Sequence, residues 1–208
     1  MRELVLHLGI GANLDDPVAT LAEAVVALAH IPGWNLEQVS PLYRTTPVGL
    51  VDQPEFFNAA LRVRATLPEE PAAAAVEVLT RVKELERLFG RVPAVRFGPR
   101  RLDIDIIAME NIAVVHPRPH GTEPDGADAD RPLVVPHPSA TERLFVLAPL
   151  ADISPALKAP GWHGTARELR DVQRPCVPQD IQRRDDAPAA AAAAQQSRKT
   201  FSSARAAG

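Results

Sequence analysis

Two aspartates separated by one residue, Asp103 and Asp105, have the type and spacing best suited to chemistry in this sequence. They lie in an alternating run in which Leu102, Ile104 and Ile106 would face a core. Alternate residues of a strand share a face, so both carboxylates should project the same way, with Cα atoms about 6.6 Å apart. Neighbouring carboxylates repel, and Mg²⁺ binds such oxygens together with substrate phosphates. The pair also fits the solvated face of a half-exposed strand.

The segment before this pair is basic and contains no acidic residue. It holds four arginines, which could bind a polyphosphate beside the metal-binding acids: Arg91, Arg96, Arg100 and Arg101. The chain lacks the G-x-x-x-x-G-K-[ST] motif of P-loop enzymes and the His-Arg-Asp and Asp-Phe-Gly motifs of protein kinases. The sequence therefore favours a phosphate-transfer site of a different kind.

Two further pairs could bind a substrate. Phe56 and Asn58 share the polar face of an alternating run, where a ring can stack on a flat heterocycle and an amide can bind its edge. They could equally be a ring covering the sheet and an amide facing water. His137 stands between two prolines, six residues before Arg143. It is either structural or a hydrogen-bond donor to nucleotide oxygens.

The elements that must position these residues follow from periodicity. Alternation predicts strands over 3–10, 36–43, 55–66 and 101–109. Helical spacing and capping residues predict helices over 16–32 and 68–90, with shorter helices around 143–150 and 165–172. The order β-α-β-β-α-β predicts an α+β fold, a ferredoxin-like antiparallel sheet with helices packed on one face.

Composition bounds the organisation of the chain. We expect one domain over residues 1–178, with an irregular Pro/Gly/Asp-rich insertion at about 116–132, and a disordered Ala-rich tail over 179–208. The net charge of −3 gives no reason to expect nucleic acid as a partner. No signal peptide or membrane span is evident, and one cysteine suits a reducing compartment, so we expect a cytoplasmic monomer.

Several ordered motifs together resemble the 6-hydroxymethyl-7,8-dihydropterin pyrophosphokinase family. The resemblance spans about residues 4–155, and its most specific run is Gly98–Ile106. The other matching stretches are Leu8–Leu14, Tyr43–Gly49, Asp52–Asn58, Gly90-Arg91, and Pro136-His137-Pro138 with Arg143 and Phe145.

The resemblance implies a site for two substrates, ATP and the hydroxymethyl-dihydropterin. Asp103 and Asp105 would bind two Mg²⁺ ions that bridge the ATP phosphates. The pterin pocket would contain Thr45, Thr46, Val48, Phe56, Asn58 and, stacking from the other side, Phe145. ATP would be held by Glu86, Arg91, Arg100, His137 and Arg143, with Arg91, Arg100 and the two aspartates as the catalytic set.

The chain departs from the family pattern in its basic segment. The stretch between Gly90 and Arg100 is about one residue shorter than the family's, and Pro93 or Ala94 stands where the family has a second loop arginine. Two alternatives remain from the residues alone. One is another metal-dependent phosphoryl or nucleotidyl transferase, and the other is a non-enzymatic ligand-binding module on the same fold.

Overall fold

The computed structural model describes residues 1–47, 52–90, 98–122, 131–173 and 180–185. The strands are β1 (Arg2–Ala12), β2 (Trp34–Val39), β3 (Leu42–Thr45), β4 (Phe56–Leu67), β5 (Asp103–Met109), β6 (Val114–His116), β7 (Leu133–Val135) and β8 (Ile181–Arg184). The helices are α1 (Pro17–Ala29), α2 (Pro71–Leu88), α3 (Leu144–Ile153) and α4 (Ala166–Gln173), with a 3-10 turn at Ala140–Glu142.

The first two helices begin at side-chain caps. The Asp16 carboxylate accepts the backbone N–H of Ala19 at 3.0 Å, and a proline follows at the first helical position. Glu70 plays the same part for α2, where it accepts two backbone N–H groups. These local signals are the reason that both helices start where the sequence predicts.

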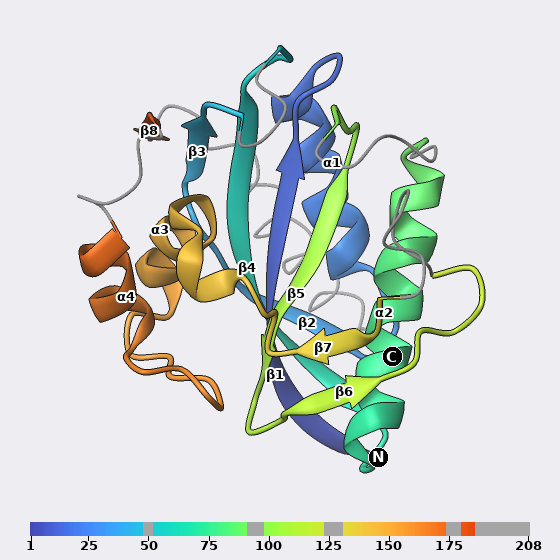
Figure 1. Ribbon diagram of the computed structural model, residues 1–208. Coiled ribbons are helices and arrows are strands. Elements are labelled where there is room, and N and C mark those ends of the chain that lie inside the picture. Colours follow the sequence, from blue (N-terminus) through green and yellow to red (C-terminus); the bar gives the residue numbers. More distant parts are fainter. Residues whose placement is uncertain (48–51, 91–97, 123–130, 174–179, 186–208) are drawn as a thin grey trace, which may run out of the picture.

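The main sheet is antiparallel, with strand order β5-β1-β4-β3-β8, and β2 pairs with the far part of β4. Strands β1 and β4 are neighbours although α1 and two strands separate them in sequence (Figure 1). This arrangement confirms the predicted ferredoxin-like α+β class. The strand expected over 36–43 is two strands, β2 and β3. They divide at Ser40-Pro41, where the Ser40 hydroxyl accepts the Ala60 N–H at 2.9 Å.

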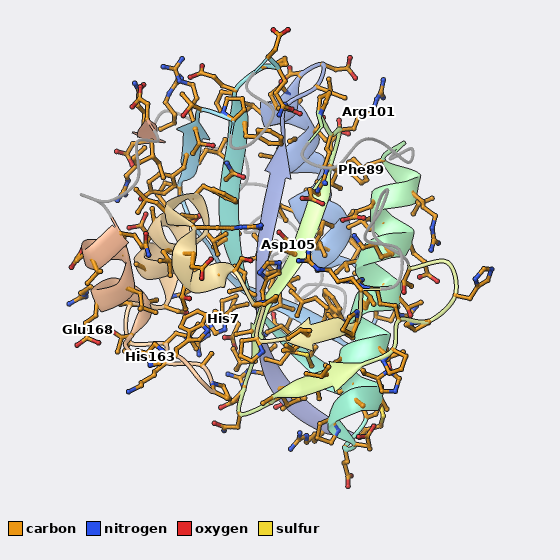
Figure 2. All side chains as sticks on the ribbon, in the orientation of Figure 1. His7, Phe89, Arg101, Asp105, His163 and Glu168 are labelled. Carbon is orange, nitrogen blue, oxygen red and sulfur yellow. The ribbon has the colours of Figure 1, made fainter. Side chains whose placement is uncertain are left out.

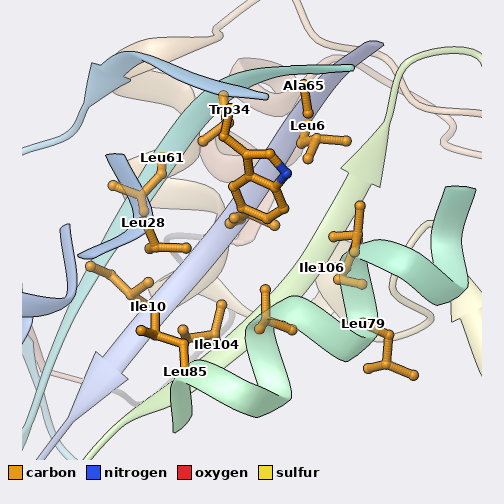
Figure 3. Packing of buried hydrophobic residues seen from close by; sticks show 14 of the residues in the cluster. Leu6, Ile10, Leu28, Trp34, Leu61, Ala65, Leu79, Leu85, Ile104 and Ile106 are labelled. Carbon is orange, nitrogen blue, oxygen red and sulfur yellow. The ribbon is translucent and has the colours of Figure 1, made fainter. Parts of the chain in front are cut away.

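Helices cover both faces of the sheet. Helices α1 and α2 bury the large aliphatic core, which includes Leu6, Leu28, Trp34 and Ile104 (Figure 3). Helix α3 packs on the opposite face, where Leu150 belongs to the same buried cluster as residues of β4 and β5. Helix α4 packs against α3 (Figure 1). The one-face expectation therefore holds for the first two helices, and the C-terminal helices form a second layer.

The alternation of β1 sets the chemistry of the two faces. Its leucines and Ile10 are buried under α1 and α2, and each such side chain contributes roughly 1.5–3 kcal/mol. The intervening positions, His7, Gly9 and Gly11, lie on the face that α3 partly covers. That second face carries the candidate site.

Two C-terminal features differ from the sequence-based expectations. The insertion at 116–132 is flanked by a hairpin, in which β6 and β7 pair from Val114↔Val135 to His116↔Leu133; residues 123–130 lie outside the described part. The tail expected to be disordered from 179 contains β8, so that expectation does not hold for residues 180–185. Within the described residues, no helix has the length and apolar character needed to cross a membrane.

Candidate active site

Asp103 and Asp105 project from the same face of β5. Both side chains are partly exposed, whereas Ile104 and Ile106 are buried in the core on the other face. Asp103 pairs with Gly11 and Asp105 with Gly9 of the neighbouring strand β1. Asp105 lies on the face that also carries His7 (Figure 2). Because glycines stand opposite both aspartates, β1 contributes no side chain to the sheet floor beside the carboxylates.

A single cross-strand row links the acids to the predicted pterin residues. Across β3, β4, β1 and β5, the row reads Tyr43, Asn58, Gly11, Asp103. Residues in register on neighbouring strands share a face, and two strand spacings place Asn58 about 10 Å from Asp103. An amide able to read a heterocycle therefore faces the acid pair across a glycine.

Asn58 is held in place by its neighbours. Its side chain is buried, and Nδ2 donates to Thr45 Oγ1 at 2.9 Å. Its Oδ1 lies over Gly11, only 2.8 Å from where a Cβ would stand. Phe56 is half-buried on the same face, and its Cα pairs with that of Thr45. The structure thus brings Thr45, Phe56 and Asn58 together, with Thr46 next in the chain. Val48 lies outside the described residues.

Arg100 lies directly beside the acid pair. Its Nη1 donates to Asp103 Oδ2 at 2.7 Å, and both side chains are about one-fifth exposed. Arg101 instead forms an exposed ion pair with Asp15 at 2.8 Å. A guanidinium at a carboxylate edge can bind both that carboxylate and an incoming phosphate. Arg91 and Arg96 lie outside the described part of the chain.

Glu86 fixes the backbone between the two aspartates. It is buried on α2, and its carboxylate accepts the Ile104 N–H at 2.7 Å. Lys83, one helical turn earlier, donates to the same carboxylate at 2.7 Å. A buried carboxylate is stable only when paired in this way. Glu86, predicted to hold ATP, therefore also holds the strand that presents Asp103 and Asp105.

His137 lies beside the bulged residue of β5. Its N–H donates to the Ile107 carbonyl at 2.9 Å, and its Nδ1 accepts the Ser139 N–H at 3.2 Å. A ring nitrogen that accepts carries no proton, so the neutral ring presents Nε2–H as a donor. Burial lowers the pKa of His137, and the nearby Asp105 charge opposes that effect. The ring is a neutral hydrogen-bond donor near the acids.

Arg143 and Phe145 stand together at the start of α3. Arg143 is the N-cap residue, and its guanidinium carbon lies 5.7 Å from the Phe145 ring centroid. A cation over a ring face is attracted by the ring's quadrupole. The contact joins a residue predicted to bind ATP to one predicted to stack on the pterin.

Asn13 is a site residue that sequence reasoning quoted in a motif without giving it a role. It is buried, and its Nδ2 donates to Gln53 Oε1 at 3.1 Å and to the Pro54 carbonyl at 3.0 Å. Its Oδ1 accepts the Arg100 N–H at 2.7 Å. One side chain thus connects the segment before β4 to the segment before β5. The available signal was its place directly after the Gly-Ile-Gly-Ala run that ends β1.

The donor set suits a hard divalent cation shared with substrate. Across the described ranges, no group of three or more His, Cys, Asp or Glu side chains could hold a metal ion by itself. Two carboxylates on a face without opposing side chains leave coordination positions for phosphate oxygens and water. Mg²⁺ prefers that combination to an all-protein cage.

Comparisons with known proteins identify the family of this chain. The family model of 7,8-dihydro-6-hydroxymethylpterin-pyrophosphokinase (HPPK) matches residues 7–155. A protein from Methylorubrum extorquens named 2-amino-4-hydroxy-6-hydroxymethyldihydropteridine pyrophosphokinase is 39% identical over 151 residues, 73% of this chain and 83% of that protein. A protein of the same name from Pseudomonas aeruginosa is 32% identical over 178 residues, 86% of this chain and 95% of that protein.

Solved structures show the same fold at lower identity. The Plasmodium falciparum HPPK-DHPS structure titled A437G with STZ-DHP matches 82% of this chain with a TM-score of 0.62 and 14% identity. This chain spans 45% of that longer one. The likeness at that identity supports the fold, whereas the family match and the curated relatives identify the family. The chain belongs to the 7,8-dihydro-6-hydroxymethylpterin-pyrophosphokinase family.

Proposed function

We propose that this chain transfers the terminal two phosphates of ATP, as one group, to the hydroxymethyl oxygen of 6-hydroxymethyl-7,8-dihydropterin. The products are AMP and the pterin diphosphate, and the step belongs to tetrahydrofolate biosynthesis. The family supplies the reaction. One observation supports the assignment of this reaction to particular residues. Asn58 and Asp103 lie on one face of the sheet, on either side of Gly11.

The pterin binds, in this proposal, on the β3–β4 side of the row. Asn58 hydrogen-bonds the edge of the ring, supported by Thr45, and Thr46 lies next along the chain. Phe56 and Phe145 stack on the two ring faces. Val48, outside the described residues, is assigned to the pterin by the family resemblance. The hydroxymethyl group then points along the row toward Asp103.

ATP binds on the β5 side. His137 donates its Nε2–H to a phosphate oxygen, and Arg100 turns part of its fork from Asp103 to the phosphates. Arg143 and Arg91 add positive charge, and Glu86 keeps β5 in position. These groups neutralise charge that develops on the phosphates and hold the reacting atoms in line.

Asp103 and Asp105 would hold two Mg²⁺ ions against the triphosphate. When bound, the metal supplies neutralisation of the attacking and leaving oxygens of an in-line displacement. The hydroxymethyl oxygen bonds to the β-phosphorus, the bond to the bridging oxygen of AMP breaks, and the hydroxyl proton is released to water. Because attack is at the β-phosphorus, AMP rather than ADP leaves.

The decisive experiment follows nucleotide products with Asp105→Ala. We expect turnover to fall more than about a hundredfold, the size of effect seen on removing a key electrostatic group, while the thermal midpoint stays close to wild type. The exposed acid Asp171 on α4, replaced by Ala, is the matched control and should leave turnover unchanged.

Three results would count against the proposal. ADP in place of AMP would indicate transfer of a single phosphate. Near-normal turnover of Asp105→Ala at saturating Mg²⁺ would remove the metal assignment. Undiminished turnover after chelation of divalent cations would do the same.

We also propose that the chain works as a cytoplasmic monomer without nucleic-acid or membrane partners. Light scattering of the purified chain measures its mass and so tests whether it is a monomer.

A further inference from the structure

The C-terminal strand β8 extends the sheet next to the pterin side of the site. It lies beyond residues 7–155, which the family model matches. It pairs antiparallel with β3 from Leu42↔Arg184 to Thr45↔Ile181 (Figure 1). The ladder continues past the strand, because the Thr46 N–H donates to the Asp180 carbonyl at 3.1 Å. Backbone contacts from β8 therefore reach both threonines assigned to the pterin.

Side chains of β8 also reach α3. Arg183 Nη1 lies 3.5 Å from Asp152 Oδ2, and the Tyr43 hydroxyl donates to that same oxygen at 2.7 Å. Asp152 belongs to α3 and Tyr43 to β3. On the solvent side, Arg44 donates to Gln182 Oε1 at 2.8 Å. These contacts join β8 to β3 and α3, two of the three elements that carry proposed pterin residues.

Ile181 provides the apolar part of the attachment. It packs against a small buried cluster of Tyr43, Leu144 and Ala148, which again combines β3 with α3. Leu144 is the neighbour of Phe145, the ring proposed to stack on the pterin. The cluster thus lies where the two walls of the pterin pocket meet.

Without β8, strand β3 would be an edge strand held only by β4, and this side of the pterin pocket would be poorly ordered. Its register with β4 covers only Tyr43↔Asn58, Arg44↔Phe57 and Thr45↔Phe56. A four-residue edge strand held from one side opens locally at low free-energy cost. A second ladder from β8 keeps Thr45 and Thr46 ordered before the ligand arrives. A wall that is already ordered loses less entropy on binding, and this raises affinity.

We infer that β8 is a positioning element of the pterin pocket, supplied by the chain's own C-terminal extension and selective for the pterin over ATP. The selectivity follows from the sheet order, in which β8 and β5 occupy opposite ends. Two of the residues proposed for ATP lie at the β5 end, where Arg100 donates to Asp103 and the His137 N–H donates to the Ile107 carbonyl. The inference rests on the proposed function.

The test uses a proline in the full-length chain. Thr46 and Asp180 form a hydrogen-bonded pair, so the alternation of an antiparallel ladder makes Gln182 and Arg44 the next such pair. Gln182→Pro removes the ladder donor, whereas Gln182→Ala keeps the donor and loses only the side-chain contact with Arg44. A chain ending at residue 179 serves as a second variant, and one ending at 185 as its control.

We expect Gln182→Pro and the chain ending at 179 to bind hydroxymethyl-dihydropterin about tenfold more weakly, or about 1.4 kcal/mol. Calorimetry with a non-hydrolysable ATP analogue should show unchanged nucleotide affinity. Hydrogen exchange of the Thr45 and Thr46 amides should be faster in both variants. Gln182→Ala and the chain ending at 185 should match the wild type in all three measurements.

The outcomes separate this inference from the proposed function. If the wild-type chain binds the pterin and both disrupted variants bind it equally well, β8 has no positioning role and the proposed function stands. Equal weakening for pterin and ATP analogue would show general damage and would also overturn the inference. A wild-type chain that binds no pterin would overturn the proposed function and this inference with it.

Discussion

Gly11 is the residue at which the two halves of the site come closest. It separates Asn58 from Asp103 in their cross-strand row, and the Asn58 amide lies over its Cα. The requirement here is close approach, since a Cβ at this position would stand 2.8 Å from Asn58 Oδ1. A side chain would have to displace the amide that is proposed to read the pterin.

Gly11→Ala should therefore raise the KM for the pterin at least about tenfold, the loss expected for one misplaced hydrogen-bonding group. The KM for ATP should change little, because the contacts of Arg100 and His137 are not involved. Steady-state kinetics with each substrate varied in turn measure both values.

Gly9→Ala is the matched control for that variant. A Cβ there would meet Ile107 at 3.4 Å and Asp105 Cβ at 3.9 Å, which are ordinary contacts. We expect its pterin KM to stay within about twofold of wild type, since tolerated substitutions cost less than about 0.5 kcal/mol. A larger loss at Gly9 than at Gly11 would mean that Asn58 is not the sensitive partner.

At this scale, the sequence predicted residues whose function lies in their own side chains. Alternation was enough to place Asp103 and Asp105 on one face, and Phe56 with Asn58 on one face. It could not reveal the role of Gly11, because that role depends on which residues of β4 and β5 lie opposite it. Cross-strand register is set by contacts distant in sequence.

Among the elements, the ends of β1, β4 and β5 meet at the Asn13 side chain. Its amide bonds two segments that approach the site from opposite sides, at Pro54 and at Arg100. The backbone of Asn13 adds a further bond to the Arg100 carbonyl at 3.0 Å. Arg100 is thus fixed at its main chain before its side chain reaches Asp103.

Asn13→Ala should lower the free energy of unfolding by about 1 kcal/mol, because it removes the acceptor of the partly buried Arg100 N–H and the donor to the Pro54 carbonyl. Turnover should fall as well, since Arg100 loses its anchor. Urea unfolding and kinetics measure the two effects. Asn35→Ala on the exposed side of β2 is the control, and an equal loss there would contradict this explanation.

Element prediction succeeded where local signals were strong and failed where pairing decided the outcome. Helix α1 starts at the Asp16 cap that its sequence indicates, and α2 starts within three residues of the predicted position 68, at the Glu70 cap. Strands β6, β7 and β8 have three or four residues each, too few for periodicity to identify them, and each exists through its partner strand. The break between β2 and β3 falls at Pro41, which has no backbone N–H to donate to a strand ladder.

For the whole molecule, a buried histidine of β1 contacts the second helical layer. His7 Nε2 lies 2.8 Å from the Ser154 hydroxyl, at the C-terminal end of α3. Burial, together with the nearby Arg62 charge, lowers the pKa of His7 to about 4, although Glu37 acts in the opposite direction. In the unfolded chain the same ring would titrate near its ordinary value of 6.5.

Stability should therefore fall as the pH drops from 6.5 toward 4. In that window the unfolded chain binds a proton at His7 and the folded chain does not, so acid favours unfolding. The free energy of unfolding should fall by about 2 kcal/mol between pH 6.5 and 5. Urea unfolding measures this effect. Between pH 6.5 and 5, His7→Gln should lose less free energy of unfolding than the wild type, by about that amount. His163→Gln, which replaces an exposed ring, should follow the wild type.

The two edge strands of the sheet, β5 and β8, affect the tendency of the protein to self-associate. An unpaired strand edge is a template for strands of other molecules, and natural sheets guard against this with short or charged edges. At one border, the His137 N–H occupies the Ile107 carbonyl of β5. At the other, β8 shields β3 and is itself only four residues long, with Arg183 and Arg184 at its end. Removing β8 should leave the backbone N–H and C=O groups along that edge of β3 unpaired. The protein should then aggregate more readily at high concentration.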